Sequence, residues 1–125
     1  MARHGSGADE IRQRIEHDFG YDLSLSIDEL RPRYSWRGLD GKEDGGTCQA
    51  SVPQAISCAL QASDYEDAVR NSISIGGDSD TIGCITGSIA EALFGLPIDI
   101  REKGRSYLTA DLLSVVDAFA ERFPG

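Results

Sequence analysis

Positive charge is scarce in this sequence: 12 Lys and Arg residues stand against 21 Asp and Glu residues, and the formal net charge is -9. A protein that binds nucleic acid through its phosphates needs a basic face, and anionic membrane surfaces attract basic segments. The composition therefore predicts no nucleic-acid partner and no membrane partner. It still permits a phosphate-bearing small molecule as ligand, because bound divalent cations reverse the local field.

Cysteine is also scarce, and the three cysteines, Cys48, Cys58 and Cys84, include no Cys-x-x-Cys pair. An odd number without metal-ligand spacing favours reduced thiols over a disulfide framework or a zinc site, which predicts a cytoplasmic protein. Cys58 and Cys84 lie in apolar helical runs and are expected to be inert core residues. We see no signal-peptide pattern, and we expect no apolar segment to be long enough to cross a bilayer.

Hydrophobic periodicity predicts an all-α fold, a compact orthogonal bundle of about six helices in one small domain. We expect residues 1–7 to form a flexible N-terminal tail and residues 8–125 to form the helical domain. Ile11, Ile15 and Phe19 mark the apolar stripe of the first helix, which Gly20 ends. The predicted helices cover about residues 8–19, 51–62, 63–75, 79–94 and 99–108, followed by a last helix capped by Thr109, with a short helical turn after Ser26.

Three pairs of residues resemble capping boxes, in which a Ser and a Glu or Gln three residues later satisfy the first amides of a helix. They are Ser26 with Glu29, Ser51 with Gln54, and Ser63 with Glu66. Ile73 and Ile75 alternate with serines and would also suit a short strand, although Gly76 and Gly77 follow closely. In the helix from Ser79, small residues recur every fourth position, which predicts a central helix closely approached by another backbone.

A basic and aromatic cluster lies between the first two long helices. It contains Arg31, Arg33, Tyr34, Trp36 and Arg37. Such residues could stack a nucleobase or grip a phosphate. We favour the alternative that Tyr34 and Trp36 attach a loop to the core. His17 is interpreted as a surface histidine.

The chemically most informative segment is Gly76-Gly77-Asp78-Ser79-Asp80-Thr81, at the start of the helix over residues 79–94. In an ideal helix, Asp80 lies roughly 200° around the axis from Asp78, so the two carboxylates converge only if Asp78 lies in the preceding loop. The two glycines permit such a loop. Three hard oxygen ligands, from Asp78, Asp80 and Thr81, would suit Mg²⁺ or Mn²⁺ better than Zn²⁺.

Simpler readings of this segment compete with the metal site. Acids are common at helix starts, and Asp78 and Asp80 could serve only as a cap and as partners of the helix dipole. An EF-hand loop is excluded because Ile82 and Ile89 occupy ligand positions. A haloacid-dehalogenase-like phosphatase is disfavoured because Gly-Gly, not a buried strand, precedes Asp78.

The segment Ile75 to Ile82, followed by Thr86-Gly87-Ser88-Ile89-Ala90, resembles the C-terminal signature of the ADP-ribosylglycohydrolase family, which includes the dinitrogenase reductase-activating glycohydrolase. The similarity extends upstream through residues 49–55 and 64–70. It implies that residues 8–125 are the C-terminal portion of that all-α fold. It also implies that Asp78, Asp80 and Thr81 bind a pair of Mg²⁺ or Mn²⁺ ions, and we expect Gly76, Gly77 and Ser79 to contact the ligand.

The resemblance implies hydrolysis of the glycosidic bond between ADP-ribose and a modified acceptor. The family's other metal ligands lie in a Thr-Asp-Asp-Thr segment that this sequence lacks, and no general base is identified. We therefore expect half of a binuclear site, belonging to a fragment, a reduced paralogue or one subunit of a homo-oligomer. The alternative is a catalytically inactive binding or structural module.

Overall fold

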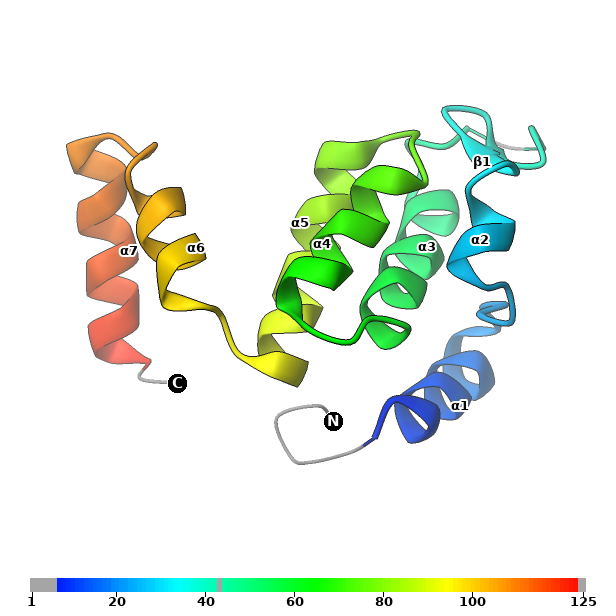
Figure 1. Ribbon diagram of the computed structural model, residues 1–125, viewed down its shortest axis with the longest axis horizontal. Helices are drawn as coiled ribbons and strands as arrows, with labels where there is room; N and C mark the ends of the chain where they lie inside the picture. Colours follow the sequence, from blue (N-terminus) through cyan, green and yellow to red (C-terminus); the bar gives the residue numbers. More distant parts are fainter. Residues whose placement is uncertain (1–6, 43, 124–125) are drawn as a thin grey trace. The chain divides into compact units, whose positions relative to one another are not determined.

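The computed structural model describes residues 7–42 and 44–123, which divide after Gly95 into two compact units (Figure 1). The predicted all-α fold is confirmed, since helices dominate both units. The first unit contains α1 (Ala8–Phe19), α2 (Ile27–Leu30), the strands β1 (Tyr34–Ser35) and β2 (Gly38–Leu39), α3 (Cys48–Leu60), α4 (Tyr65–Ser74) and α5 (Ser79–Phe94). The second contains α6 (Ile98–Arg105) and α7 (Ala110–Arg122). The predicted tail lies outside the described residues except for Gly7, the extended residue before α1.

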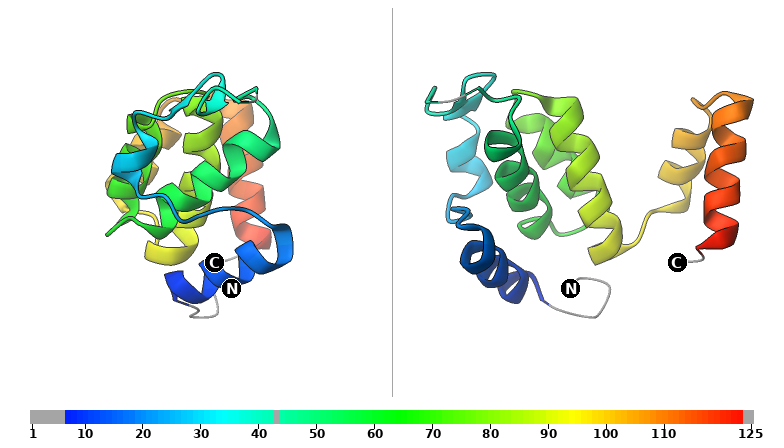
Figure 2. Two further views of the ribbon diagram at one scale, coloured as in Figure 1. Left: turned by 90° about the vertical axis from the view of Figure 1, so that its right-hand side faces the viewer. Right: turned by 180° about the vertical axis from the view of Figure 1, so that it is seen from behind.

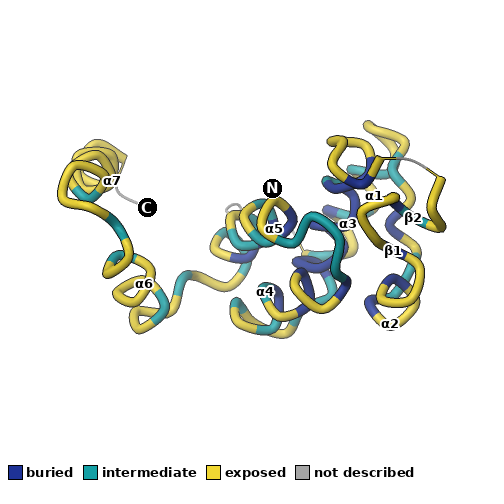
Figure 3. The backbone as a smooth tube through the Cα atoms, turned by 90° about the horizontal axis from the view of Figure 1, so that it is seen from above, coloured by how far each residue is buried: buried dark blue, intermediate teal, exposed yellow. Residues whose placement is uncertain are grey.

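The core of the first unit is built on α3, α4 and α5, which lie side by side (Figure 2). We expected α5 to be the central helix, but α3 is the most deeply buried, with every residue from Ala50 to Leu60 except Val52 out of solvent (Figure 3). The reason is that α3 packs against α4 and α5 and also against α1 and β2. Thr86 of α5 donates a hydrogen bond to the Ala55 carbonyl oxygen of α3 at 3.1 Å.

Two apolar clusters fill this unit. One joins α1 to α3 and contains Ile11, Leu23, Ile56 and Leu60. The C-terminal half of α5 contributes the half-buried Ile89 and Leu93 to it. The other lies around the start of α5 and contains Ile27, Leu30, Tyr34, Ala55, Cys58, Ile75 and Ile82. The second cluster therefore supports the end of α4 and the beginning of α5, where the Gly-Gly-Asp-Ser-Asp-Thr segment lies.

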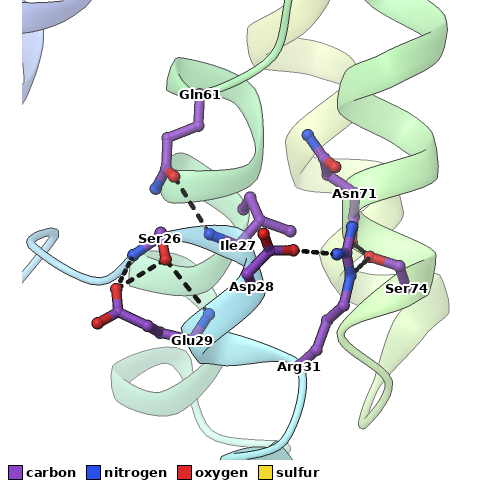
Figure 4. A network of polar contacts seen from close by, with 8 residues as sticks. All are labelled: Ser26, Ile27, Asp28, Glu29, Arg31, Gln61, Asn71 and Ser74. Carbon is purple, nitrogen blue, oxygen red and sulfur yellow. Dashed lines mark hydrogen bonds and ion pairs between the residues drawn. The ribbon is translucent and has the colours of Figure 1, made fainter.

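The capping box predicted at Ser26 is confirmed: the Glu29 amide donates to Ser26 Oγ at 3.3 Å, and the Ser26 amide donates to Glu29 Oε2 at 2.9 Å. Gln61, which ends α3, binds both sides of this turn. Its side-chain amide donates to the Leu25 carbonyl at 2.9 Å. Its oxygen accepts from the Ile27 amide at 3.2 Å (Figure 4). The short helix α2 is thus held in place by α3.

The other two predicted capping boxes were placed wrongly. Helix α3 begins at Cys48, and Ser51 lies inside it, buried, with its hydroxyl donating to the Thr47 carbonyl at 2.8 Å. That bond satisfies the serine hydroxyl without a cap. Because α3 begins at Cys48, Pro53 lies in its second turn. Helix α4 is capped one residue later than expected, because Asp64, rather than Ser63, accepts the amide of Asp67 at 2.8 Å.

Phe19, predicted on an apolar stripe, and Cys84, predicted in the core, are exposed. Phe19, in the last turn of α1, is 68% exposed and stacks on Tyr21 with ring centroids 6.0 Å apart. Cys84 lies on the outer face of α5, whereas Cys58 is fully buried, and burial raises the pKa of its thiol to about 12. Periodicity located both residues in helices but did not distinguish the covered face from the open one. His17 is exposed, as predicted, beside Asp18.

The stripe of small residues on α5 faces α4. A Cβ on Gly83 would lie 3.5 Å from Ser72 Oγ, and a Cβ on Gly87 would lie 3.2 Å from Tyr65 Oη. Ile73, in the segment that also suited a strand, belongs to α4. The close approach that the glycines predicted is therefore an α4–α5 contact.

The two glycines should respond differently to substitution. Gly83→Ala adds a methyl at ordinary contact distance and should raise the free energy of unfolding by up to about 1 kcal/mol, since alanine favours a helix interior. Gly87→Leu must displace Tyr65 and should lower it by about 1–3 kcal/mol through overpacking. Urea unfolding followed by the fluorescence of Trp36, the single tryptophan, measures both. A Gly87→Leu variant as stable as the parent would show that Tyr65 moves aside freely.

In the second unit, Arg105 of α6 donates to Asp117 of α7 at 2.8 Å. Thr109 precedes α7 as predicted, but its hydroxyl contacts the Asp111 carboxylate instead of capping an amide. Neither helix contains a fully buried residue, and Leu112, Val115, Val116 and Phe119 are exposed. In the part of the chain that the structure describes, no helix combines the length and apolarity needed to cross a membrane.

Candidate functional site

The candidate site is the loop between α4 and α5. Gly76 and Gly77 both adopt the left-handed conformation, with φ of 75° and 71°, which residues with a Cβ rarely adopt. They reverse the chain so that Asp78 lies just before the first residue of α5, with φ -78° and ψ 65°. The expectation that Asp78 lies in the loop and the helix begins at Ser79 is confirmed.

The Asp78 carboxylate does not cap α5: although its carbonyl accepts the first helical bond, from Ile82 at 2.9 Å, its side chain accepts no amide of the helix. Its side chain instead contacts Asp80. The pKa of Asp80 lies below its usual value, chiefly because of a hydrogen bond from the Asp78 carboxyl, and also because the Asp80 and Thr81 amides point toward its carboxylate. The two acids thus converge on one another, although ideal helical spacing would separate them.

Convergence of two carboxyls has a chemical consequence. Two carboxylates at hydrogen-bonding distance repel unless a proton or a cation lies between them. Asp80 is exposed and Asp78 half-buried, so solvent has access to the pair. The pair is therefore available to a ligand and is not sealed into the fold.

The other predicted site residues lie around this pair. Thr81 is exposed in the first turn of α5. Ser79 is half-buried, and its hydroxyl approaches the Gly77 carbonyl oxygen at 3.5 Å. All six residues of the predicted site therefore belong to one loop and one helical turn.

The oxygen donors fit Mg²⁺ or Mn²⁺ in kind, since these ions take carboxylate, hydroxyl and water oxygens. They fall short in number. Among residues 7–42 and 44–123, no three His, Cys, Asp or Glu side chains come together in a metal-ligating group. Two carboxylates and the Thr81 hydroxyl would leave most coordination positions of two ions to water, substrate or another chain.

Two contacts that sequence reasoning missed hold the loop from outside. Arg31, the residue after α2, donates to Ser74 Oγ at 3.0 Å, and Ser74 in turn donates to the Asn71 carbonyl at 2.8 Å, which fastens the last turn of α4 (Figure 4). Asp28 pairs with the same guanidinium. The second contact is that of Tyr34 with Gly77. The only sequence signal for either contact was the cluster of arginines and aromatic residues, because both contacts join residues that lie far apart in the sequence.

The prediction that Tyr34 and Trp36 attach a loop to the core is correct for Tyr34 only. Tyr34 is 4% exposed and attaches the β1–β2 hairpin to the core, whereas Trp36, at the tip between the strands, is 62% exposed. Arg33 is engaged with Asp40 at 2.9 Å, which lowers the pKa of that carboxyl to about 2. Two of the three arginines of the cluster, Arg31 and Arg33, are thus held in ion pairs.

Comparison with known proteins places this chain in a family. A family model described as ADP-ribosylglycohydrolase matches residues 2–125. The comparisons with curated proteins and with solved structures returned no match. The family match extends over almost the whole sequence and includes the loop in which Asp78 and Asp80 converge, and it supports a glycohydrolase-like function at the level of the family. The chain belongs to the ADP-ribosylglycohydrolase family.

Proposed function

We propose that the Gly76–Thr81 loop binds Mg²⁺ or Mn²⁺, as a pair in the complete site, and that the chain contributes to hydrolysis of the glycosidic bond between ADP-ribose and an acceptor. The observation that carries the proposal is the contact between two solvent-accessible carboxyls, of which Asp78 is not used as the side-chain cap of α5. A helix-start role alone requires no such convergence.

The residues of the loop have distinct tasks in this proposal. Asp78 and Asp80 hold the cations with their negative charge, and the hydroxyl of Thr81 adds a neutral oxygen. Gly76 leaves the backbone bare, so that a ligand can approach closely. Gly77 is covered on its side-chain face and would meet the ligand on its other face, and Ser79 contacts that ligand. When bound, divalent cations orient ribose hydroxyls and activate a water for attack at the anomeric carbon.

The set of ligands must be completed from beyond this loop. Mg²⁺ requires a near-octahedral arrangement of six oxygens, and the two acids and one hydroxyl supply only part of it. A second copy of the chain, further residues of the family's metal site, or the substrate could supply the rest. We propose ADP-ribose or an ADP-ribosylated protein as the ligand. A binding or structural module without catalysis is the competing outcome.

The proposal is tested by incubating the chain with a set of ADP-ribosylated proteins and measuring released ADP-ribose by chromatography. Because the loop supplies only part of the metal site, we expect at most weak release by the chain alone, and any release should require Mg²⁺ or Mn²⁺ and stop when EDTA is added. Metal-dependent binding of ADP-ribose without release would support the module instead. Absence of both binding and release would contradict the proposed function.

A further inference from the structure

We propose that Tyr34 is a positioning residue for the Gly76–Thr81 loop, acting through Gly77 to keep Asp78 and Asp80 together. The functional meaning of this inference rests on the proposed function, because it is the proposed metal ligands that Tyr34 would position. The contact itself is independent of any ligand.

The first observation is how closely the ring covers Gly77. A Cβ added to this glycine would lie 2.5 Å from Tyr34 Cε1 and 3.1 Å from Cδ1, closer than side chains tolerate. It would also lie 3.2 Å from the Ser35 carbonyl carbon. The tyrosine ring and the β1 backbone thus occupy the space on the side-chain face of Gly77. Gly76, one residue earlier, has nothing within 4 Å of the corresponding position.

The second observation is that the ring is itself fixed. Tyr34 is 4% exposed, and its hydroxyl donates to the Gly45 carbonyl at 3.1 Å. The strand that carries it pairs with β2, where Tyr34 lies opposite Leu39. Because its backbone, ring and hydroxyl are all engaged, the ring presents a rigid surface to Gly77.

The third observation is that Tyr34 belongs to the apolar cluster that brackets the loop. Ile75 precedes the two glycines, Ile82 follows Thr81, and both are buried in the same cluster as Tyr34, at 2% and 0% exposure. The loop is therefore held at both ends and at its middle. Glycine has the widest choice of backbone conformations, so the middle contact restricts the residue most able to redirect Asp78.

The inference predicts different effects for removing the whole ring of Tyr34 and for removing only its hydroxyl. Removing the ring in Tyr34→Leu should free Gly77, whereas Tyr34→Phe keeps the ring and loses only its bond to Gly45. Leu23→Ala is the matched control, since Leu23 is equally buried but belongs to the α1–α3 cluster. It should lower stability without altering the loop.

The experiment uses the full chain and two readouts. Amide hydrogen exchange over residues 76–81 should be at least about tenfold faster in Tyr34→Leu than in Leu23→Ala, because release of Gly77 opens the loop locally. Affinity for Mn²⁺, measured by calorimetry, should fall about 10–100-fold in Tyr34→Leu, as for other groups that orient metal ligands. Tyr34→Phe should show smaller changes in the same direction.

The outcomes separate this inference from the proposed function. Unchanged exchange over residues 76–81 in Tyr34→Leu, or an equal increase in Leu23→Ala, would overturn the role of Tyr34. If the parent chain binds no Mn²⁺, the proposed function loses its support and exchange alone decides about Tyr34. If Tyr34→Leu does not fold, Tyr34→Phe decides: faster exchange confined to residues 76–81 supports the inference, and unchanged exchange overturns it.

Discussion

Replacing Asp80 with Asn should abolish Mn²⁺ binding and any metal-dependent release of ADP-ribose. The substitution keeps the size of the side chain and removes the charge that, with Asp78, would hold the cation. Loss of even an outer group that orients a ligand costs about 10–100-fold in affinity or activity, so loss of a direct ligand should cost more than about 100-fold. Calorimetric titration with Mn²⁺ and the ADP-ribose release assay measure the two effects.

The chain contains a matched control for this substitution. Asp111 is the second residue of α7, as Asp80 is of α5, and the pKa of Asp111 also lies below its usual value, chiefly because Thr109 hydrogen-bonds to its carboxylate. If Asp80 serves only the start of a helix, Asp80→Asn and Asp111→Asn should both leave Mn²⁺ titrations like those of the parent. That result would refute the metal site, whereas loss of binding in Asp80→Asn alone would support it.

Gly77→Ala should be the most damaging single-methyl substitution in the loop. Alanine at φ 71° is strained, and left-handed backbone costs a residue with a Cβ about 1–2 kcal/mol. The methyl would also meet the Tyr34 ring at 2.5 Å, and overpacking adds about 1–3 kcal/mol. We expect a total loss of about 2–5 kcal/mol in the free energy of unfolding, measured by urea unfolding with Trp36 fluorescence.

Gly76→Ala separates the two contributions. Gly76 has a nearly identical φ of 75° but no atom within 4 Å of a Cβ, so its substitution should cost only the backbone strain of about 1–2 kcal/mol. Equal losses for the two variants would mean that the Tyr34 ring yields easily. Such a result would also count against Tyr34 as a rigid support of the loop.

Local chemistry was enough to predict several elements of this protein. Residues 8–19 and 79–94 form helices with the predicted bounds, because apolar periodicity and a terminal glycine at positions 20 and 95 are signals read over a single helix. The conformation of the Gly76-Gly77 pair, and with it the position of Asp78 ahead of α5, followed from the absence of a Cβ. For the same reason the candidate site could be located before its geometry was known.

Tertiary structure decided which faces are covered and what supports the site. Ser51 has the sequence of a cap, yet it lies buried inside α3, since its hydroxyl is satisfied by the Thr47 carbonyl. Cys84 lies in an apolar helical run and Phe19 on the apolar stripe of α1, yet both are exposed, because no other element of the described chain covers them. The contact of Tyr34 with Gly77 joins residues 43 positions apart, as does the bond of Arg31 to Ser74.

The sequence alone determined the helices and the loop that carries the acids, because those depend on neighbouring residues. What packs against them depends on how distant segments meet, and only the folded chain decides that.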